Sequence, residues 1–411
     1  MATISSGRTL PRAIPQAAPI ADELGEYRFR QVAAWALLVL LFQAILGLGW
    51  DIRWHSTFGR DTFWAPPHLL LYSGIALAGF VCIAVVLLDT WRYYRRAPGV
   101  TDATTWPVFG VFRAPLGFVV AGCGLAVLLF AAPFDNWWHE LYGLDVTLWA
   151  PFHVMGLIGA FIGGSGSLYA FAALGAQARR LGLERRRFLG FSGPDWATLL
   201  TLSTLLTLLL TATQPATTIA PTLNLGPLRI LTFPILLCAF FLPILIVAVR
   251  VTERPGAATI TMLLFFARQV FIAAFVPWAL RLAHQFDPSY AYRNGEPQFI
   301  AAIALGPLAF IPAALVLDLV VRRQRDAGAN MSGRGWLRAG LLAALPLIAL
   351  APILVRGAAR GLRGQLPPGL IIPEFALLPA FLVAIPLALV VAVLAVRVGE
   401  DWGAILRLND R

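Results

Sequence analysis

The sequence predicts an all-α integral membrane protein, a polytopic bundle of about ten transmembrane helices. Two observations predict this class. Hydrophobic residues make up 59% of the 411-residue chain, and charged residues make up only 13%. Apolar runs close to the roughly 20 residues that span a bilayer recur along the whole length. A soluble protein would have to bury these runs in a core much larger than a chain of this size normally builds, so that class is excluded.

The predicted spans are the apolar runs between the polar and arginine-rich segments. Proline at the start of a run suits the first turn of a helix, where no backbone donor is lost. In chain order the spans are 31–50, 68–89, 114–132, 149–174, 196–213, 230–249, 257–280, 299–321, 337–355 and 370–396.

These spans divide the chain into four parts. Residues 1–30 are predicted as a cytoplasmic N-terminal tail, and residues 31–175 as two successive two-helix units with Asp/His motifs. Residues 195–398, rich in Leu, Ala, Pro and Thr, are predicted as a supporting transmembrane bundle, and 399–411 as a cytoplasmic C-terminal tail.

Arginine-rich loops fall on one side of the predicted bundle, at 90–106, 175–195 and 322–336. The positive-inside rule places that side, and both termini, in the cytoplasm of a multi-pass cell-membrane protein. The loop 356–369 departs from the rule, because it is basic and should face outward. The formal net charge of +11 then indicates contact with an anionic lipid surface rather than with nucleic acid.

Two segments, 49–74 and 133–159, repeat one arrangement of residues. Each has an aspartate, a histidine four residues later, a Gly-x-Asp step and a closing Trp-Ala-Pro-x-His. This internal repeat predicts that the first four helices form a duplicated helix pair. Its polar members are Asp51, His55, Asp61 and His68 in the first unit and Asp135, His139, Asp145 and His153 in the second.

Helical geometry predicts that the first aspartate and both histidines of each unit meet. Asp51 and His55 lie one turn apart on one helix face. Pro66 and Pro67 suit the first turn of the next helix, so His68 returns to the same membrane surface. Two histidines and a carboxylate bind iron, zinc or copper and leave positions open for water or substrate. The predicted metal ligands are Asp51, His55, His68, Asp135, His139 and His153.

Four other residues are candidates for supporting the metal. Asp61 and Asp145 are candidate fourth ligands, or partners that fix the imidazole tautomers. His284 follows a predicted span on the outward side, where it either covers the site or belongs to a solvated loop. Arg268 falls inside a span, where a charge normally faces the bundle interior. Anion binding, a proton path and a buried ion pair are all open for it.

The same histidines also have structural interpretations. Histidine, tryptophan and aspartate anchor helix ends at a membrane surface, and the tryptophans of both units resemble an aromatic belt. Hydrogen bonding between aspartate and histidine needs no metal, and a haem or proton-relay role is a further alternative. All five histidines are nevertheless predicted on one face. This clustering favours one shared site or two related sites.

The first unit resembles a known metal-binding pattern. Asp51, His55 and His68 read D-x3-H-x12-H, which is similar to the pattern in the C subunit of the particulate methane and ammonia monooxygenases. In that copper-dependent membrane family the aspartate and both histidines bind a metal, so the resemblance implies the same role for these three residues. It also implies copper in preference to zinc or iron. Partner membrane subunits are a further implication. The second unit departs by one residue (D-x3-H-x13-H), and the family does not carry the pattern twice.

Three functions follow from these interpretations. The first is an integral membrane metal-binding protein, a copper-dependent oxidoreductase with its site near the extracytoplasmic face. The second is a metal-ion or small-solute transporter that uses the same Asp and His ligands. The third is a non-catalytic membrane scaffold. All three imply contact with the lipid bilayer and none with nucleic acid, and the pattern names no catalytic residue.

Overall fold

A computed structural model describes residues 19–59, 62–142, 148–183, 187–218, 221–328, 331–361 and 374–407. Within these residues, ten helices are long and apolar enough to cross a membrane, as the sequence predicts. The membrane-length helices are α1 (Pro19–Thr57), α2 (Pro66–Tyr94), α3 (Leu116–Tyr142), α4 (Pro151–Arg180), α5 (Gly193–Ala212), α7 (Phe233–Thr252), α8 (Ala257–Phe286), α10 (Ile311–Asp326, continuing from α9 and η1), α11 (Gly333–Gly361) and α12 (Glu374–Arg407).

The remaining elements are short. The small helices are α6 (Pro215–Thr218), α9 (Ala301–Leu305) and the 3-10 helix η1 (Gly306–Phe310). Two antiparallel hairpins pair β1 (Trp106–Val108) with β2 (Phe112–Ala114) and β3 (Thr222–Leu225) with β4 (Leu228–Leu231). The sequence analysis did not predict these hairpins, because three- and four-residue strands leave no periodic pattern.

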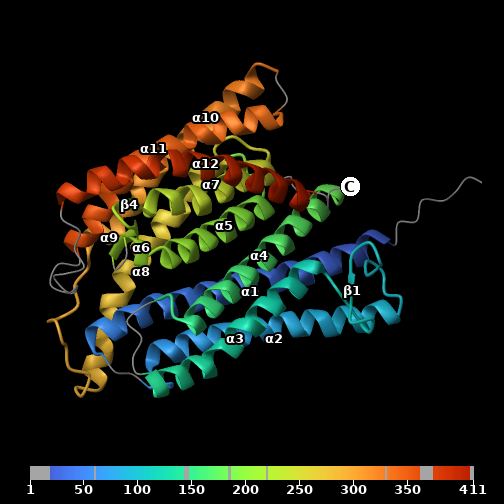
Figure 1. Cartoon of the computed structure of the whole chain (residues 1–411). Coiled ribbons are helices and arrows are strands. Elements are labelled where there is room, and N and C mark those ends of the chain that lie inside the picture. Colours follow the sequence, from blue (N-terminus) through green and yellow to red (C-terminus); the bar gives the residue numbers. More distant parts are fainter. Residues whose placement is uncertain are drawn as a thin grey trace, which may run out of the picture.

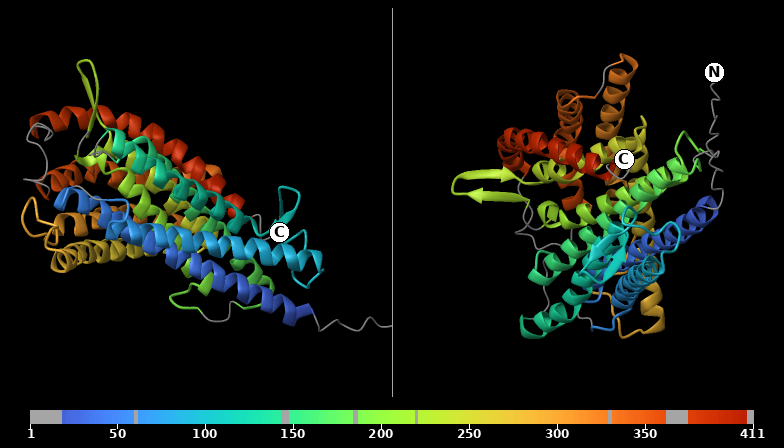
Figure 2. Two further views of the ribbon diagram at one scale, coloured as in Figure 1. Left: turned by 90° about the horizontal axis from the view of Figure 1, so that it is seen from below. Right: turned by 90° about the vertical axis from the view of Figure 1, so that its right-hand side faces the viewer.

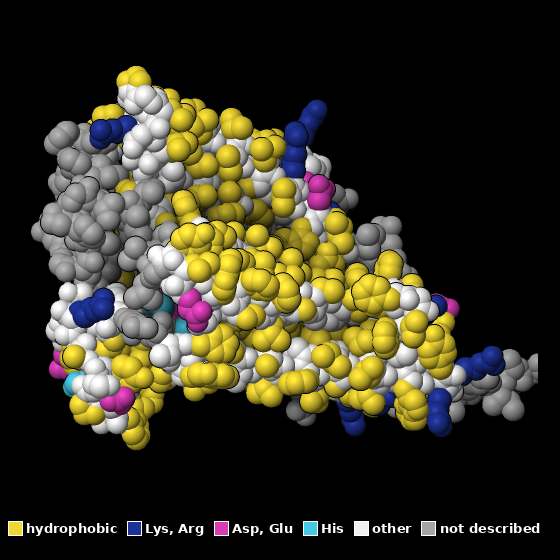
Figure 3. All heavy atoms as spheres, turned by 60° about the horizontal axis from the view of Figure 1, so that its bottom comes forward, with side chains coloured by type: hydrophobic (Ala, Val, Ile, Leu, Met, Phe, Trp, Pro, Cys, Tyr) yellow, Lys and Arg dark blue, Asp and Glu magenta, His cyan; other side chains and the backbone are white. Residues whose placement is uncertain are grey.

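The helices alternate in direction, so their ends gather at two ends of the bundle (Figure 1). Helices α1 to α4 lie together in one part of the molecule, and α7, α11 and α12 lie together in another, with α5 between them (Figures 1 and 2). Hydrophobic side chains cover the middle of the molecule, and charged side chains lie toward its two ends (Figure 3). This distribution fits a bundle whose apolar middle faces lipid.

Helix α1 begins well before the predicted span, so part of the predicted N-terminal tail is helical. Ion pairs hold this extension against the end of α2. Arg30 contacts Asp89 at 2.8 Å and Glu26 at 2.7 Å, and Arg92 contacts Glu26 at 2.7 Å. Asp89 is fully buried, and a buried carboxylate needs such partners. Helix α12 likewise extends to Arg407, into the predicted C-terminal tail.

Glycines let the helices of each pair approach closely, and the contacts occur at matching positions. A Cβ on Gly74 would lie 2.9 Å from the carbonyl oxygen of Leu40, and a Cβ on Gly159 would lie 2.7 Å from that of Gly124. Gly74 and Gly159 each follow the closing histidine of their unit by six residues. Small residues at helix crossings give the close backbone packing that stabilises helix pairs in membranes.

Replacing Gly159 by alanine should weaken the α3–α4 crossing. The new methyl group would collide with backbone atoms of Gly124 and Leu128, which cannot rotate away, so we expect a loss of about 1–3 kcal/mol. Thermal unfolding in detergent micelles measures this loss. Gly156→Ala is the matched control on the same helix, because a Cβ there meets nothing within 4 Å. Equal melting temperatures for the two variants would contradict the crossing.

Candidate metal centres

The first candidate centre forms where α1 ends and α2 begins. Helix α1 continues past the predicted end of its span as far as Thr57. Its last turns therefore carry Asp51 and His55. Helix α2 starts at Pro66 after an extended Ala65, so His68 lies in its first turn. Antiparallel packing of the two helices then brings His68 back to Asp51.

The three side chains converge on one point. The Asp51 Oδ1 atom lies 3.0 Å from Nε2 of His68 and 3.4 Å from Nε2 of His55. One ligand atom from each residue lies within 4.8 Å of the other two, a spacing that suits a single ion. The side chains are only 14–25% exposed. These residues could hold a metal ion.

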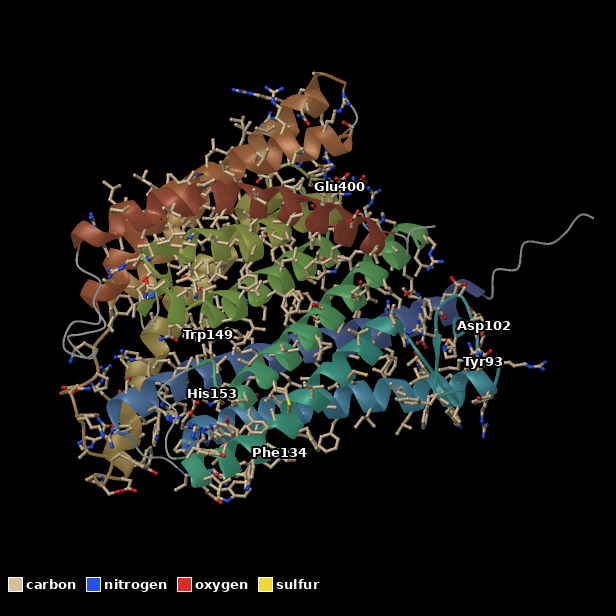
Figure 4. The ribbon with its side chains drawn as sticks, viewed as in Figure 1. Tyr93, Asp102, Phe134, Trp149, His153 and Glu400 are labelled. Carbon is tan, nitrogen blue, oxygen red and sulfur yellow. The ribbon has the colours of Figure 1, made fainter. Side chains whose placement is uncertain are left out.

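The second candidate centre has the same construction at the end of α3 and the start of α4. The Asp135 carboxylate lies 3.5 Å from Nε2 of His139 and 3.3 Å from Nε2 of His153. These ligand atoms also lie within 4.8 Å of one another. Figure 4 places His153 near Phe134, which precedes the aspartate on α3, at the end of the bundle opposite Asp102.

The contacts of His68 require either a second proton on its ring or a metal ion at the first centre. Nδ1 of His68 faces two backbone carbonyls, those of Thr62 at 3.1 Å and Phe63 at 3.2 Å. Its Nε2 faces the Asp51 carboxylate. A neutral imidazole carries one N–H, so one of its nitrogens must present a lone pair to an acceptor. Donation from Nδ1 to a carbonyl is the usual arrangement of a metal-binding histidine, and it leaves Nε2 to bind the ion.

The Asp51 carboxylate supports the same conclusion. Oδ1 of Asp51 is buried and accepts no hydrogen bond from the residues that the structure describes. The short contact between Asp51 and His68 therefore lacks hydrogen-bond geometry. A buried anionic oxygen without a donor is costly. A metal ion at the centre of the triad would satisfy it.

A close backbone approach sets the separation of α1 and α2 beside the first centre. Gly47 lies one turn before Asp51, and a Cβ on it would lie 2.5 Å from the backbone nitrogen of Leu71. Gln43 strengthens the contact, because its side chain donates to the Leu70 carbonyl at 3.1 Å and to Ser73 at 2.9 Å. Gln43 thus joins α1 to α2 by hydrogen bonds.

The predicted supporting residues have different positions. Asp61 and Asp145 lie outside the described residues. Neither candidate centre includes His284, whose Nδ1 bonds the Tyr290 carbonyl at 2.8 Å. Arg268 donates to the Leu200 carbonyl at 3.3 Å and lies over the ring of Phe42, between α8, α5 and α1.

The Asp/His motif gave no indication of the loop that packs beside the first centre. The loop 287–297 packs on the last turn of α1, where Tyr290 contacts the ring of Trp54. Partial burial raises the pKa of the Tyr292 phenol in this loop. A chain separation of more than two hundred residues hides such a contact from analysis of one sequence. Tyr290 and Tyr292 were the available signal for this contact. Tyrosines at alternate positions occur in many exposed loops, so they did not predict it.

Comparison with known proteins adds no relative. No family model matches the chain, no curated protein matches it, and no solved structure matches it. The function therefore has to be argued from the two Asp/His triads and their position at the end of the bundle.

Replacing Asp51 by asparagine should separate metal binding from structural hydrogen bonding. The amide places a donor opposite the lone pair of His68, so the metal-free variant should gain about 1 kcal/mol of stability over the metal-free parent. It should also lose the rise in melting temperature that a bound ion gives. Thermal unfolding with and without added Cu²⁺ measures both effects. Marked destabilisation of the metal-free variant would instead indicate a structural Asp–His⁺ ion pair.

Proposed function

We propose that this chain is an integral membrane metalloprotein that binds one metal ion in each of its two Asp-His-His triads. One observation carries the proposal: at Asp51 and His68 a buried carboxylate oxygen and an imidazole nitrogen lie 3.0 Å apart without hydrogen-bond geometry. A cation between them turns an unfavourable contact into two bonds. The second triad repeats the arrangement, which supports our inference that the two helix pairs are copies of one unit.

We propose further that the ions are copper and that the protein is an oxidoreductase. Imidazole nitrogen suits copper, and among divalent first-row metals such sites bind Cu²⁺ most tightly. Two imidazoles and one carboxylate leave positions open for oxygen or a small substrate. The D-x3-H-x12-H spacing of Asp51, His55 and His68, similar to that of the copper monooxygenase subunit, supports the same choice.

The protein residues would hold and orient the ligands. Asp51, His55 and His68 would bind the ion, and the carbonyls of Thr62 and Phe63 would fix the ring of His68 with Nε2 inward. The ring of Tyr72 lies 5.4 Å from that of His68, where it would limit the access of water. A bound copper ion would supply one-electron chemistry at the open positions.

The orientation of the bundle follows from the same proposal. Helices α2, α4 and α10 carry arginines in their last turns, at the end of the bundle opposite the two triads (Figure 1). By the positive-inside rule we infer that this end faces the cytoplasm. The triads would then lie near the outer face of the cell membrane, where substrate and partner membrane subunits can reach them.

Metal stoichiometry tests the proposal most directly. Purified protein should be stripped with a chelator, loaded with Cu²⁺, passed through a desalting column and analysed for metal. The parent protein should hold two ions per chain, because there are two triads. His55→Ala and His139→Ala should each hold about one, and the double variant about none, since loss of one of three ligands removes most of the affinity.

Glu140→Gln is the matched control for these variants. It changes an exposed carboxylate next to His139 that belongs to neither triad, so it should leave two ions bound. If the parent protein is folded and still holds no metal after loading, the proposal is overturned. Loading with Zn²⁺ at higher affinity than Cu²⁺ would retain the sites but reject copper.

Redox activity separates an enzyme from a carrier of ions. The Cu²⁺-loaded protein should show a paramagnetic signal that ascorbate removes and air restores, with the copper retained throughout. The His55→Ala/His139→Ala variant should show no such signal. Release of the metal on reduction, or its passage into sealed vesicles that contain the protein, would favour a transporter instead.

A further inference from the structure

The two triads differ in what packs behind them. At the first, Trp54 precedes His55 on α1 and is 0% exposed. Tyr290, from the loop 287–297 that follows α8, lies 4.7 Å from its ring, edge to face. Phe58, one turn later, contacts both Tyr290 and Tyr292. The last turn of α1 is therefore enclosed by aromatic groups from a distant part of the chain.

The same loop is also bonded to the backbone of α1. The amide of Arg293 donates to the carbonyl of Thr57 at 2.9 Å, and the side chain of Asn294 donates to that of Ser56 at 3.3 Å. Carbonyls at a helix C-terminus lack partners within the helix, so these bonds hold its final turn. Gly59, at φ +89°, leaves the space that the guanidinium of Arg293 fills.

Helix α8 anchors the loop at both of its ends. Nδ1 of His284 bonds the Tyr290 carbonyl at 2.8 Å, and Arg281 donates to the Pro297 carbonyl at 2.8 Å. The ring of His284 also lies 4.5 Å from that of Tyr292. The loop is thus a fixed clamp on α1, which we define as residues 287–297.

At the second triad the described aromatic contacts come from the helix pair itself. Trp138, which precedes His139, is half-buried, and its ring contacts Tyr142 on α3 and Phe152 on α4. Tyr142 is 68% exposed. Trp149, which lies just before α4, donates to the Ala212 carbonyl on α5 at 3.0 Å.

We infer that the two metal sites are unequal: the clamp 287–297 makes the first a retained site, and the second is an exchangeable one. This inference rests on the proposed metal binding. An ion leaves when one of its ligands swings away, which requires the helix end that carries the ligand to open locally. At the first site such opening must also break the contacts of Tyr290 with Trp54 and the bonds to Thr57 and Ser56.

Release of Cu²⁺ from single-site proteins tests the inference. His139→Ala keeps only the first site and His55→Ala keeps only the second. Each is loaded with Cu²⁺ in detergent, mixed with excess EDTA and followed by its visible absorbance. We expect release from the first site to be at least about tenfold slower, because the aromatic contacts of Trp54 and Phe58 with the clamp must open as well. Equal rates, or slower release from the second site, would overturn the inference while leaving metal binding intact.

A variant of the clamp then tests the cause. Tyr290→Ala in the His139→Ala background should speed release about tenfold, and Asn294→Ala, which removes one hydrogen bond and keeps the aromatic cluster, should speed it by a smaller factor. Tyr142→Ala is the matched control in the same background and should leave the rate unchanged. If Tyr290→Ala protein is folded and releases Cu²⁺ at an unchanged rate, the inference is overturned. If Tyr290→Ala does not fold, Asn294→Ala decides instead, and an unchanged rate there overturns the inference. Failure of both single-site proteins to bind Cu²⁺ would instead reject the proposed function as well.

Discussion

The contact between the Asp51 carboxylate and Nε2 of His68 depends on almost every feature of the first two helices. It needs α1 to stay helical beyond the apolar span, α2 to begin with proline at the same depth, and a carbonyl on the far side of the imidazole to orient it. It also has an electrostatic requirement. Two acceptors at 3.0 Å repel unless a proton or a metal ion lies between them. The second triad has a similar contact, between Asp135 and Nε2 of His153 at 3.3 Å, and both triads could hold a metal ion.

The two ends of the bundle are chemically different. At one end the charged groups of α1 and α2 neutralise each other, as Arg30, Asp89 and Glu26 do in a buried cluster. At the other end the histidines converge on the carboxylates of Asp51 and Asp135. Buried carboxylate oxygens without a hydrogen bond from the described residues occur at both ends, but at the first end arginines of the same chain lie beside them. At the second end the neighbours are imidazoles, and each Asp/His triad could hold a metal ion.

Much of this could be predicted from the sequence because the relevant signals are local. Long apolar runs predicted the ten membrane-length helices, and an i, i+4 spacing followed by proline predicted that Asp51, His55 and His68 would meet. The structure confirms the helices and brings the three residues together. The extension of α1 before the predicted span was not predicted, because the ion pairs that stabilise it join Arg30 to Asp89, on another helix.

The clamp on α1 could not be predicted for the same physical reason. Its bonds use backbone groups of Thr57 and Arg293, which any sequence would offer. Its aromatic contacts depend on the way α8 crosses α1 rather than on spacing along the chain. Side-chain identity and spacing therefore predicted which groups converge in the triads, whereas the contacts of the clamp come from tertiary packing.

The approach of Gly47 to Leu71 has a consequence for the choice of ion. Backbone atoms already touch one turn from the triad, so α1 and α2 cannot move closer, and the bond of Gln43 to Leu70 resists their separation. The gap of 3.0 Å between Oδ1 of Asp51 and Nε2 of His68 is therefore held nearly constant. Small ions with short, directional bonds to nitrogen would fit such a rigid gap, whereas Ca²⁺, which prefers six to eight oxygen ligands at longer range, would not. Selectivity would then come from a glycine that never touches the metal.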